Sequence, residues 1–129
     1  MLITGLVVAG IAALIHVYIF VLESVRWRHP RTRAIFGIRS DEEARVTAPL
    51  AFNQGFYNLF LAVATALGIL FAAVGSPTIG VTLVFAGTGS MLAAGVVLVV
   101  SSPSRARAAL VQAVAPLLAI VLLVVALVG

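Results

Sequence analysis

Two otherwise apolar stretches of this chain contain side chains able to do acid–base, ligand-binding or hydrogen-bonding chemistry. The first contains His16 and Glu23, which share one face of a helix because seven residues are close to two helical turns. In the second, AFNQGFYN at 51–58, the polar residues are Asn53, Gln54, Tyr57 and Asn58. An imidazole and a carboxylate can transfer protons, and amides and a phenol can donate and accept hydrogen bonds.

Metal and cofactor chemistry finds little support in this pattern. Zinc needs closely spaced His, Cys or carboxylate ligands, whereas the groups expected near His16 are mostly neutral amides, so no metal site is predicted. Haem would need a second axial histidine, and His29 precedes Pro30 in a loop. Acid–base catalysis by His16 with Glu23 is chemically reasonable, but no substrate is indicated, so catalytic residues and cofactors stay unassigned. The chain has no cysteine, which excludes disulfides and thiolate sites.

The hydrophobic composition of the chain indicates which kind of helix positions these groups. Hydrophobic residues make up 63% of the 129 residues, and the mean hydropathy is +1.23, which is more than a soluble domain can bury. A membrane-spanning helix needs roughly 20 mostly apolar residues. Four segments satisfy this length, at about 3–22, 48–74, 78–100 and 106–128. The predicted fold is all-α, a single domain over 1–129 that forms one four-helix transmembrane bundle.

Positive charge is confined to two connections between these segments. The arginines of the loop at 24–47 are Arg26, Arg28, Arg31, Arg33, Arg39 and Arg45, and those of the loop at 101–107 are Arg105 and Arg107. Loops rich in arginine stay in the cytoplasm, so both termini are expected outside a bacterial-type inner (plasma) membrane. The expected partner of this charge is the anionic lipid bilayer and not nucleic acid.

The first loop also carries signals of local structure. Arginines alternate with aromatic and aliphatic residues from 26 to 39, which is typical of a membrane-surface anchor; the predicted anchor residues are Arg26, Trp27, Arg28, Arg31 and Arg33. Ser40 and Glu43 have the spacing of a capping box, which predicts a short helix that Pro49 then kinks or separates from the second span.

Serines before prolines mark two further helix starts. Ser76 and Ser102 each precede a proline, and we expect their hydroxyls to cap the helices that follow.

The positions of small and polar residues predict which helix faces point inward. Small residues let two helices approach closely, and polar residues find no hydrogen-bond partner in lipid. In the first span the stripe is Gly5, Ala9, Ala12, His16 and Glu23, within an arc of roughly 60°. In the second, an arc of about 140° holds Asn53, Gln54, Tyr57, Asn58, Leu61 and Thr65. In the third, Ala86, Ser90 and Ala94 recur every four positions, and Gly87, Gly89 and Gly95 are further small residues suited to close packing. The small-residue stripes suit homo-oligomers as well as packing within the chain.

The expected depth of these polar side chains in the membrane then predicts a site. His16 lies about 10 Å deeper than Glu23, and Gln112 enters from the other arginine-bearing loop to a similar level. The candidate ligand-binding residues of this cytoplasm-facing polar pocket are His16, Glu23, Asn53, Gln54, Tyr57, Asn58 and Gln112. The alternative is structural: His16 bonded to Asn58 or Gln54 across a helix interface, and Glu23 paired with Arg26.

Three segments carry a resemblance to a known family. HVYIFVLE at 16–23, RHPRTRAIFGI at 28–38 and AFNQGFYNLFLA at 51–62 resemble the four-helix membrane proteins grouped as domain of unknown function 1304. The resemblance draws attention to His16, Glu23 and the NQGFYN element, and it implies no activity.

Weaker similarities are to the eicosanoid- and glutathione-metabolising membrane enzymes, through Arg45, Val46 and Asn53, and to small multidrug exporters, through a glutamate in the first span. The spacing of Arg45 and Asn53 is too long for the enzymes, and Glu23 lies nearer the membrane edge than the exporter glutamate. The leading hypothesis is therefore a membrane protein that binds, or transports, an unknown small polar or amphipathic molecule. A membrane-embedded enzyme and a structural accessory subunit are the alternatives.

Overall fold

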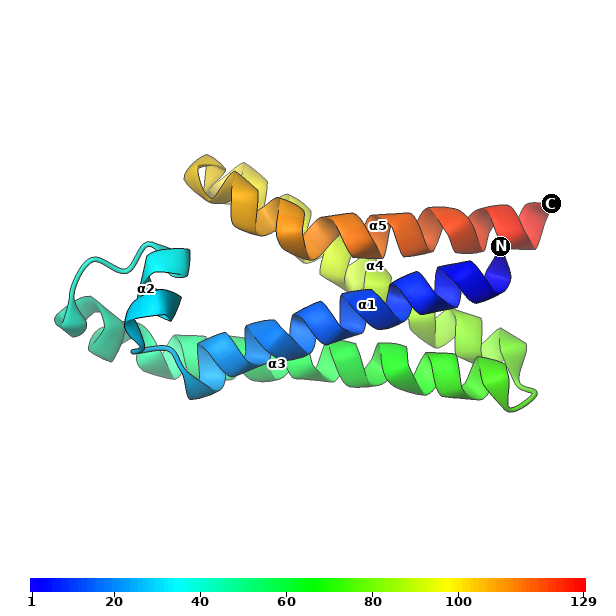
Figure 1. Ribbon diagram of the computed structural model, residues 1–129, viewed down its shortest axis with the longest axis horizontal. Helices are drawn as coiled ribbons and strands as arrows, with labels where there is room; N and C mark the ends of the chain where they lie inside the picture. The colour runs from blue at the N-terminus through cyan, green and yellow to red at the C-terminus, as the bar shows by residue number, and fades with distance from the viewer.

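The computed structural model describes residues 1–129, of which 89% are helical, and it contains no strand. Figure 1 shows the path of the chain. The elements in chain order are α1 (Leu2–Phe20), the π-helical turn η1 (Val21–Val25), α2 (Pro30–Phe36), α3 (Asp41–Ala73), α4 (Pro77–Ser101), the 3-10 turn η2 (Pro103–Arg105) and α5 (Ala106–Val128). Four helices are long and apolar enough to cross a membrane, so the predicted all-α, four-span fold is confirmed.

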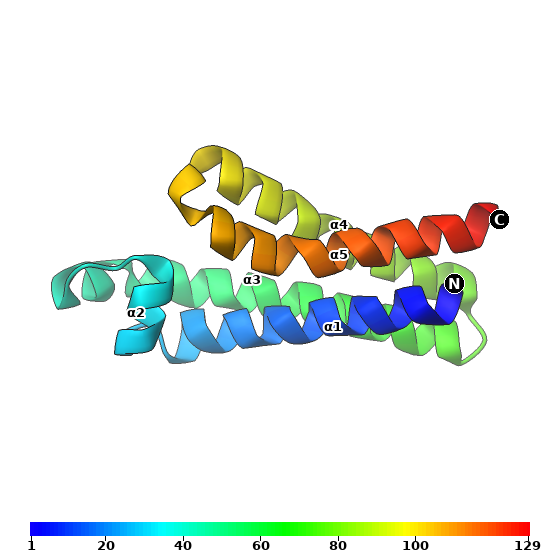
Figure 2. The same ribbon diagram turned by 45° about the horizontal axis from the view of Figure 1, so that its top comes forward.

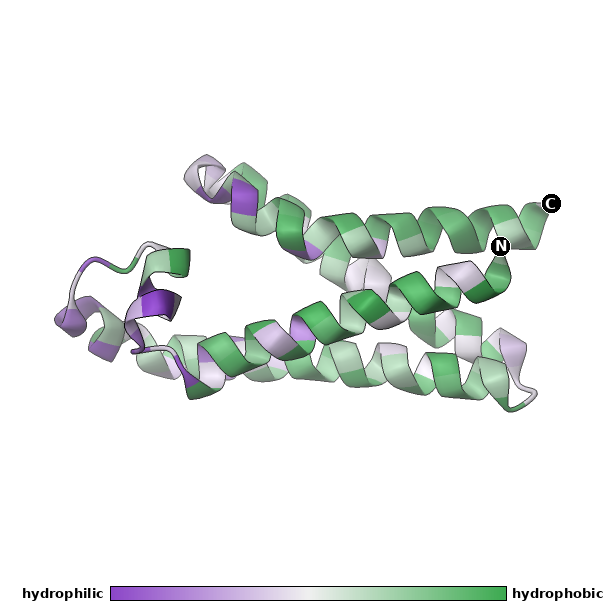
Figure 3. Cartoon of the chain, viewed as in Figure 1, coloured by the Kyte–Doolittle hydropathy of each residue, from purple (hydrophilic) through white to green (hydrophobic).

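The four long helices form a bundle in which each packs against two neighbours. α1 contacts α3 and α5, and α4 contacts the same two helices. Both chain termini and the α3–α4 turn lie at one end, which we call the uncharged end, whereas the hydrophilic residues gather around α2 and the start of α3 at the other, the charged end (Figure 3). In both Figure 1 and Figure 2 the α4–α5 hairpin leans away from α1 and α3 toward the charged end.

The second span is longer than predicted. α3 begins at Asp41 instead of 48, so the expected loop at 24–47 contains α2 and the first turns of α3. The capping box that starts it is confirmed: the Glu43 N–H donates to Ser40 Oγ (3.0 Å), and the Arg39 N–H donates to the Glu43 carboxylate (2.8 Å). Pro49 lies inside this continuous helix, although a proline removes one backbone donor.

The other two predicted N-caps are confirmed in position, but the predicted hydroxyl bonds are absent. α4 and η2 begin at Pro77 and Pro103, but neither Ser76 nor Ser102 makes a side-chain cap bond. Their ψ angles, 61° and 77°, fall short of the extended value (161° at Ser40) that turns a hydroxyl toward the first turn.

The start of α2 has a cap that the sequence analysis did not predict. His29 is extended, and its Nδ1 accepts a hydrogen bond from the Arg31 N–H at 3.3 Å.

Close packing rests on small residues, as expected inside a bilayer. The predicted stripe of α1 is confirmed, because all five of its members are buried. For α4 the prediction is confirmed for Gly87 and Gly95, which are buried, and wrong for Ala86, Ser90 and Ala94, which are exposed. The buried face of α4 instead carries Gly80, Val81, Val84, Gly87, Thr88, Met91 and Gly95. Glycine decides this orientation because it permits a closer backbone approach than alanine does.

The α3–α4 crossing gives a test of this packing. A Cβ placed on Gly68 would lie 2.7 Å from the Gly80 carbonyl oxygen and 2.7 Å from the Val84 nitrogen, both backbone atoms. We expect Gly68→Ala to lower the free energy of unfolding by about 1–3 kcal/mol, measured by thermal denaturation in detergent micelles. Gly89→Ala is the matched control, since a Cβ at Gly89 meets nothing within 4 Å. Equal melting temperatures for Gly68→Ala and Gly89→Ala would contradict the close approach of α3 and α4.

Candidate functional site

The candidate site centres on a hydrogen bond between two buried polar side chains. Asn58 on α3 donates through Nδ2 to Glu23 Oε2 at 2.8 Å and to the Gln54 carbonyl oxygen at 3.2 Å. Glu23 is 9% exposed and Asn58 is 8% exposed. The predicted ion pair of Glu23 with Arg26 is absent, because the ion pairs of the chain are Arg33–Asp41 and Arg45–Glu42. The Glu23 carboxylate therefore has a neutral partner.

Glu23 lies within a local change of helix type. The Arg26 N–H bonds the Val21 carbonyl at 2.9 Å, five residues back, which makes residues 21–25 a π-helical turn. Such a turn inserts one extra residue into the helical repeat and so redirects the side chains that follow it. π-Helical turns are rare and frequently occur at functional sites. The seven-residue spacing of His16 and Glu23 is that of a regular α-helix and gives no signal of this turn.

Gly55 allows this turn to lie directly against α3. A Cβ on Gly55 would lie 3.0 Å from the Ser24 nitrogen and 3.1 Å from Glu23 Cβ, so no larger residue fits without movement. Ser24 also donates through Oγ to the Phe52 carbonyl oxygen at 2.8 Å. Gly55 in the NQGFYN element is the sequence signal that could have indicated this contact.

His16 is fully buried but does not bond another helix. Its Nδ1 lies 2.9 Å from the Ala12 carbonyl oxygen, one turn back in α1. Because a carbonyl oxygen only accepts, Nδ1 carries the proton in this bond. The structural alternative, in which His16 bonds Asn58 or Gln54, does not describe this geometry.

Three of the predicted pocket residues lie on the surface of the chain. Asn53, Gln54 and Tyr57 are exposed, so their predicted inward orientation is wrong, and Gln112 on α5 is half-buried. α4 covers α3 near Thr65 and Gly68 but leans away toward the charged end, which leaves Gln54 and Tyr57 uncovered (Figures 1 and 2). The structure joins Glu23 with Asn58, and it does not gather the seven candidate residues around one pocket.

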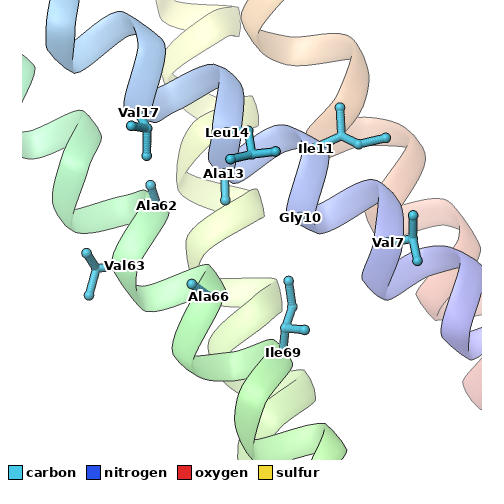
Figure 4. A pocket seen from close by; sticks show the side chains of 10 residues that line it. All are labelled: Val7, Gly10, Ile11, Ala13, Leu14, Val17, Ala62, Val63, Ala66 and Ile69. Atoms are coloured by element: carbon cyan, nitrogen blue, oxygen red, sulfur yellow. The ribbon is translucent and has the colours of Figure 1, made fainter.

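A cavity of about 550 Å³ lies between α1 and α3, toward the uncharged end from Asn58 (Figure 4). None of the seven candidate residues lines it, and its walls are apolar. It is therefore not the predicted polar pocket.

A metal site and the arginine of the enzyme hypothesis are the other possibilities that the sequence raises, and neither involves Glu23. The structure contains no group of three or more His, Cys, Asp and Glu side chains that could hold a metal ion. Arg45, which the enzyme hypothesis requires, is exposed and bonds Glu42 through Nε (3.0 Å) and Nη2 (2.6 Å).

The predicted anchor residues fall into two groups. Trp27 and Arg33 bind within the chain: Trp27 Nε1 donates to Thr47 Oγ1 at 3.1 Å, and Arg33 pairs with Asp41. The other three residues are exposed and have no carboxylate partner: Arg26, Arg28 and Arg31. Trp27 and Arg33 thus tie the α2 region to the start of α3, and the remaining arginines are free to meet other groups.

The Glu23–Asn58 bond gives a second test. Asn58→Ala leaves a buried carboxylate without its donor, and we expect a loss of about 1–3 kcal/mol in the free energy of unfolding. Asn53→Ala is the matched control on the same helix, because Asn53 is exposed, and we expect a change within about 0.5 kcal/mol. The free energy of unfolding of each variant is measured by thermal denaturation in detergent micelles. A larger loss for Asn53→Ala than for Asn58→Ala would refute the pairing.

Comparison with known proteins adds a family and no activity. Neither the curated proteins nor the solved structures contain a match to this chain. The model of one family, described as protein of unknown function (DUF1304), matches residues 10–124, which include η1, all of α3 and the Glu23–Asn58 bond. That span is most of the chain, and it contains the three segments, at 16–23, 28–38 and 51–62, whose sequences resemble this family. The chain belongs to the DUF1304 family.

Proposed function

We propose that this protein binds a small amphipathic molecule with a cationic or amine head group in the charged half of the bundle. The single observation that carries the proposal is the Glu23 carboxylate, which is buried in an apolar span and bonded to a neutral amide. Ionisable side chains inside membrane spans are costly to bury and usually mark ligand or ion sites. Transport of the molecule would use the same site.

The charge of Glu23 determines the class of ligand. A buried carboxylate is stable only if a cation or a proton compensates its charge, and Asn58 supplies neither. A cationic head group would supply the missing charge, whereas an anion would add a second negative charge. The preferred ligand is therefore an amine and not a carboxylic acid or phosphate.

Neighbouring exposed groups support the amphipathic character of the ligand. Tyr57 is 57% exposed and lies one residue before Asn58, so its ring offers a face to a cation and its hydroxyl offers a hydrogen bond. Gln54, exposed one turn earlier, adds an amide. Both lie on the part of α3 from which α4 leans away, which leaves them accessible from the charged end (Figure 2).

Neutralising Glu23 tests the proposal. Glu23→Gln keeps an acceptor for Asn58 but removes the charge, so we expect the affinity for octylamine in lipid nanodiscs to fall about tenfold or more. Octanol, an uncharged molecule of matched length, should bind both proteins alike. Glu42→Gln is the control variant, because Glu42 is exposed and already paired with Arg45. Unchanged octylamine binding to Glu23→Gln, or no saturable binding to the wild type, would refute the proposal.

We further propose that the charged end faces the cytoplasm and lies among lipid head groups. Every arginine lies in α2, the adjoining segments, the start of α3 or the η2–α5 region, and the uncharged end has none. Arg26, Arg28 and Arg31 have no acidic partner in the chain and are available to anionic lipid.

Single cysteines test this orientation, because the natural chain contains none. Ser104→Cys lies in η2 and Thr78→Cys lies at the start of α4, and both positions are exposed. In intact bacterial cells we expect a membrane-impermeant maleimide to label Thr78→Cys and to spare Ser104→Cys until the membrane is opened. The reverse pattern would place the charged end outside.

A further inference from the structure

The apolar cavity between α1 and α3 is a groove with small residues at its centre. Its lining is Val7, Gly10, Ile11, Ala13, Leu14, Val17, Ala62, Val63, Ala66 and Ile69. Figure 4 shows that the alanines leave the space between the two helices unfilled, while larger side chains stand at its edges. No side chain in the lining can form a hydrogen bond.

The groove has a defined end toward the charged half. Phe20 on α1 and Phe56 on α3 meet edge to face, with ring centroids 5.1 Å apart. Phe20 follows the lining residue Val17 by three positions, and Phe56 precedes Val63 by seven, so each ring lies beyond the groove on its own helix. The aromatic pair bridges α1 and α3 there and separates the groove from the contact of Ser24 with Gly55.

The shape of the groove suits an extended chain. The lining of α1 runs from Val7 to Val17, about 15 Å at 1.5 Å per residue. The groove is open along one side, because Val7, Ile11, Leu14 and Val17 in its lining are exposed. An extended hydrocarbon chain can enter from that side and contact α1 and α3 together, with its carbons about 4 Å from the lining atoms.

The surroundings exclude water as a stable occupant. A bound water needs two to four polar partners, and the lining offers none. An empty groove would forfeit the contacts that its walls could make. The remaining medium at this depth of the span is hydrocarbon.

We propose that the groove is a binding site for one hydrocarbon chain of a lipid. Its length accommodates about 12 carbon atoms, taking roughly 1.2 Å of advance per bond in an extended chain. A free fatty acid and a phospholipid supply the same chain, so the site recognises the tail and not the head group. This site differs from the Glu23–Asn58 site, and failure of amine binding at Glu23 would leave it standing.

Photo-crosslinking tests the proposal on the intact protein in nanodiscs. The probes are palmitic acid and a palmitoyl phosphatidylcholine, each with a diazirine at mid-chain, and the labelled residues are read by mass spectrometry. We expect labelling per residue along the groove to exceed that at Val114 and Val121, exposed valines of α5 beside the same stretch of α1, by about fivefold or more. The probe that labels the groove identifies the source of the chain, and labelling by either one supports the site.

Filling the groove with a larger side chain should abolish the preferential labelling of the groove residues. Ala66 lines the groove and is exposed, so Ala66→Phe adds a ring to the groove without entering the core, and we expect groove labelling to fall about fivefold or more. Ala86→Phe is the matched control, on an exposed position of α4 outside the groove and beside Gly87, which meets Thr65 of α3, and it should label like the wild type. If Ala66→Phe does not fold, Ala66→Leu is used with the same expectation.

Three results would overturn the proposal. Even labelling of exposed residues on all four helices would mean that the groove holds lipid no more tightly than the rest of the surface. Undiminished groove labelling in the filled variant would mean that the chain lies elsewhere. Absence of groove labelling together with a dimer that Ala66→Phe dissociates would assign the groove to a second copy of the protein.

Discussion

The absence of water from the hydrocarbon layer is the constraint on which this structure depends. A polar group in a span must find its partner within the protein. Most do so locally: Thr65, Thr88 and Ser90 each donate to a carbonyl four residues back, as His16 does. Glu23 and Asn58 differ, because they satisfy each other across two helices. That exception fixes α1 against α3 and leaves one charge to be compensated.

The same constraint gives small residues two opposite effects. Where α3 and α4 cross, Gly68 and Gly80 bring the backbones together, and the helices exclude lipid. Between α1 and α3, Ala13, Ala62 and Ala66 face a space that no side chain of the protein fills (Figure 4). The difference lies in what the small residues meet: backbone atoms lie directly against Gly68 and Gly80, whereas Ala13, Ala62 and Ala66 line an open groove. Small residues therefore make either a tight contact or a groove.

Two proposed sites then have complementary chemistry in separate parts of one fold. The Glu23–Asn58 site offers charge and hydrogen bonds at the charged half, where the α4–α5 hairpin leans away from α3 (Figure 2). The groove offers only apolar contact farther along the same pair of helices. A protein with both could bind a charged head and a hydrocarbon tail on α1 and α3, either in one molecule or in two.

The sequence by itself determined the four spans, the fold, the capping box at Ser40 and the inward stripe of α1, because length, hydropathy and helical period are local properties. It also pointed to Glu23 and Asn58. Only the tertiary structure decided that they bond each other, since the close approach at Gly55 brings η1 against α3. Likewise, the exposure of Gln54 and Tyr57 depends on where α4 leaves α3, and that path is set by contacts distant in sequence.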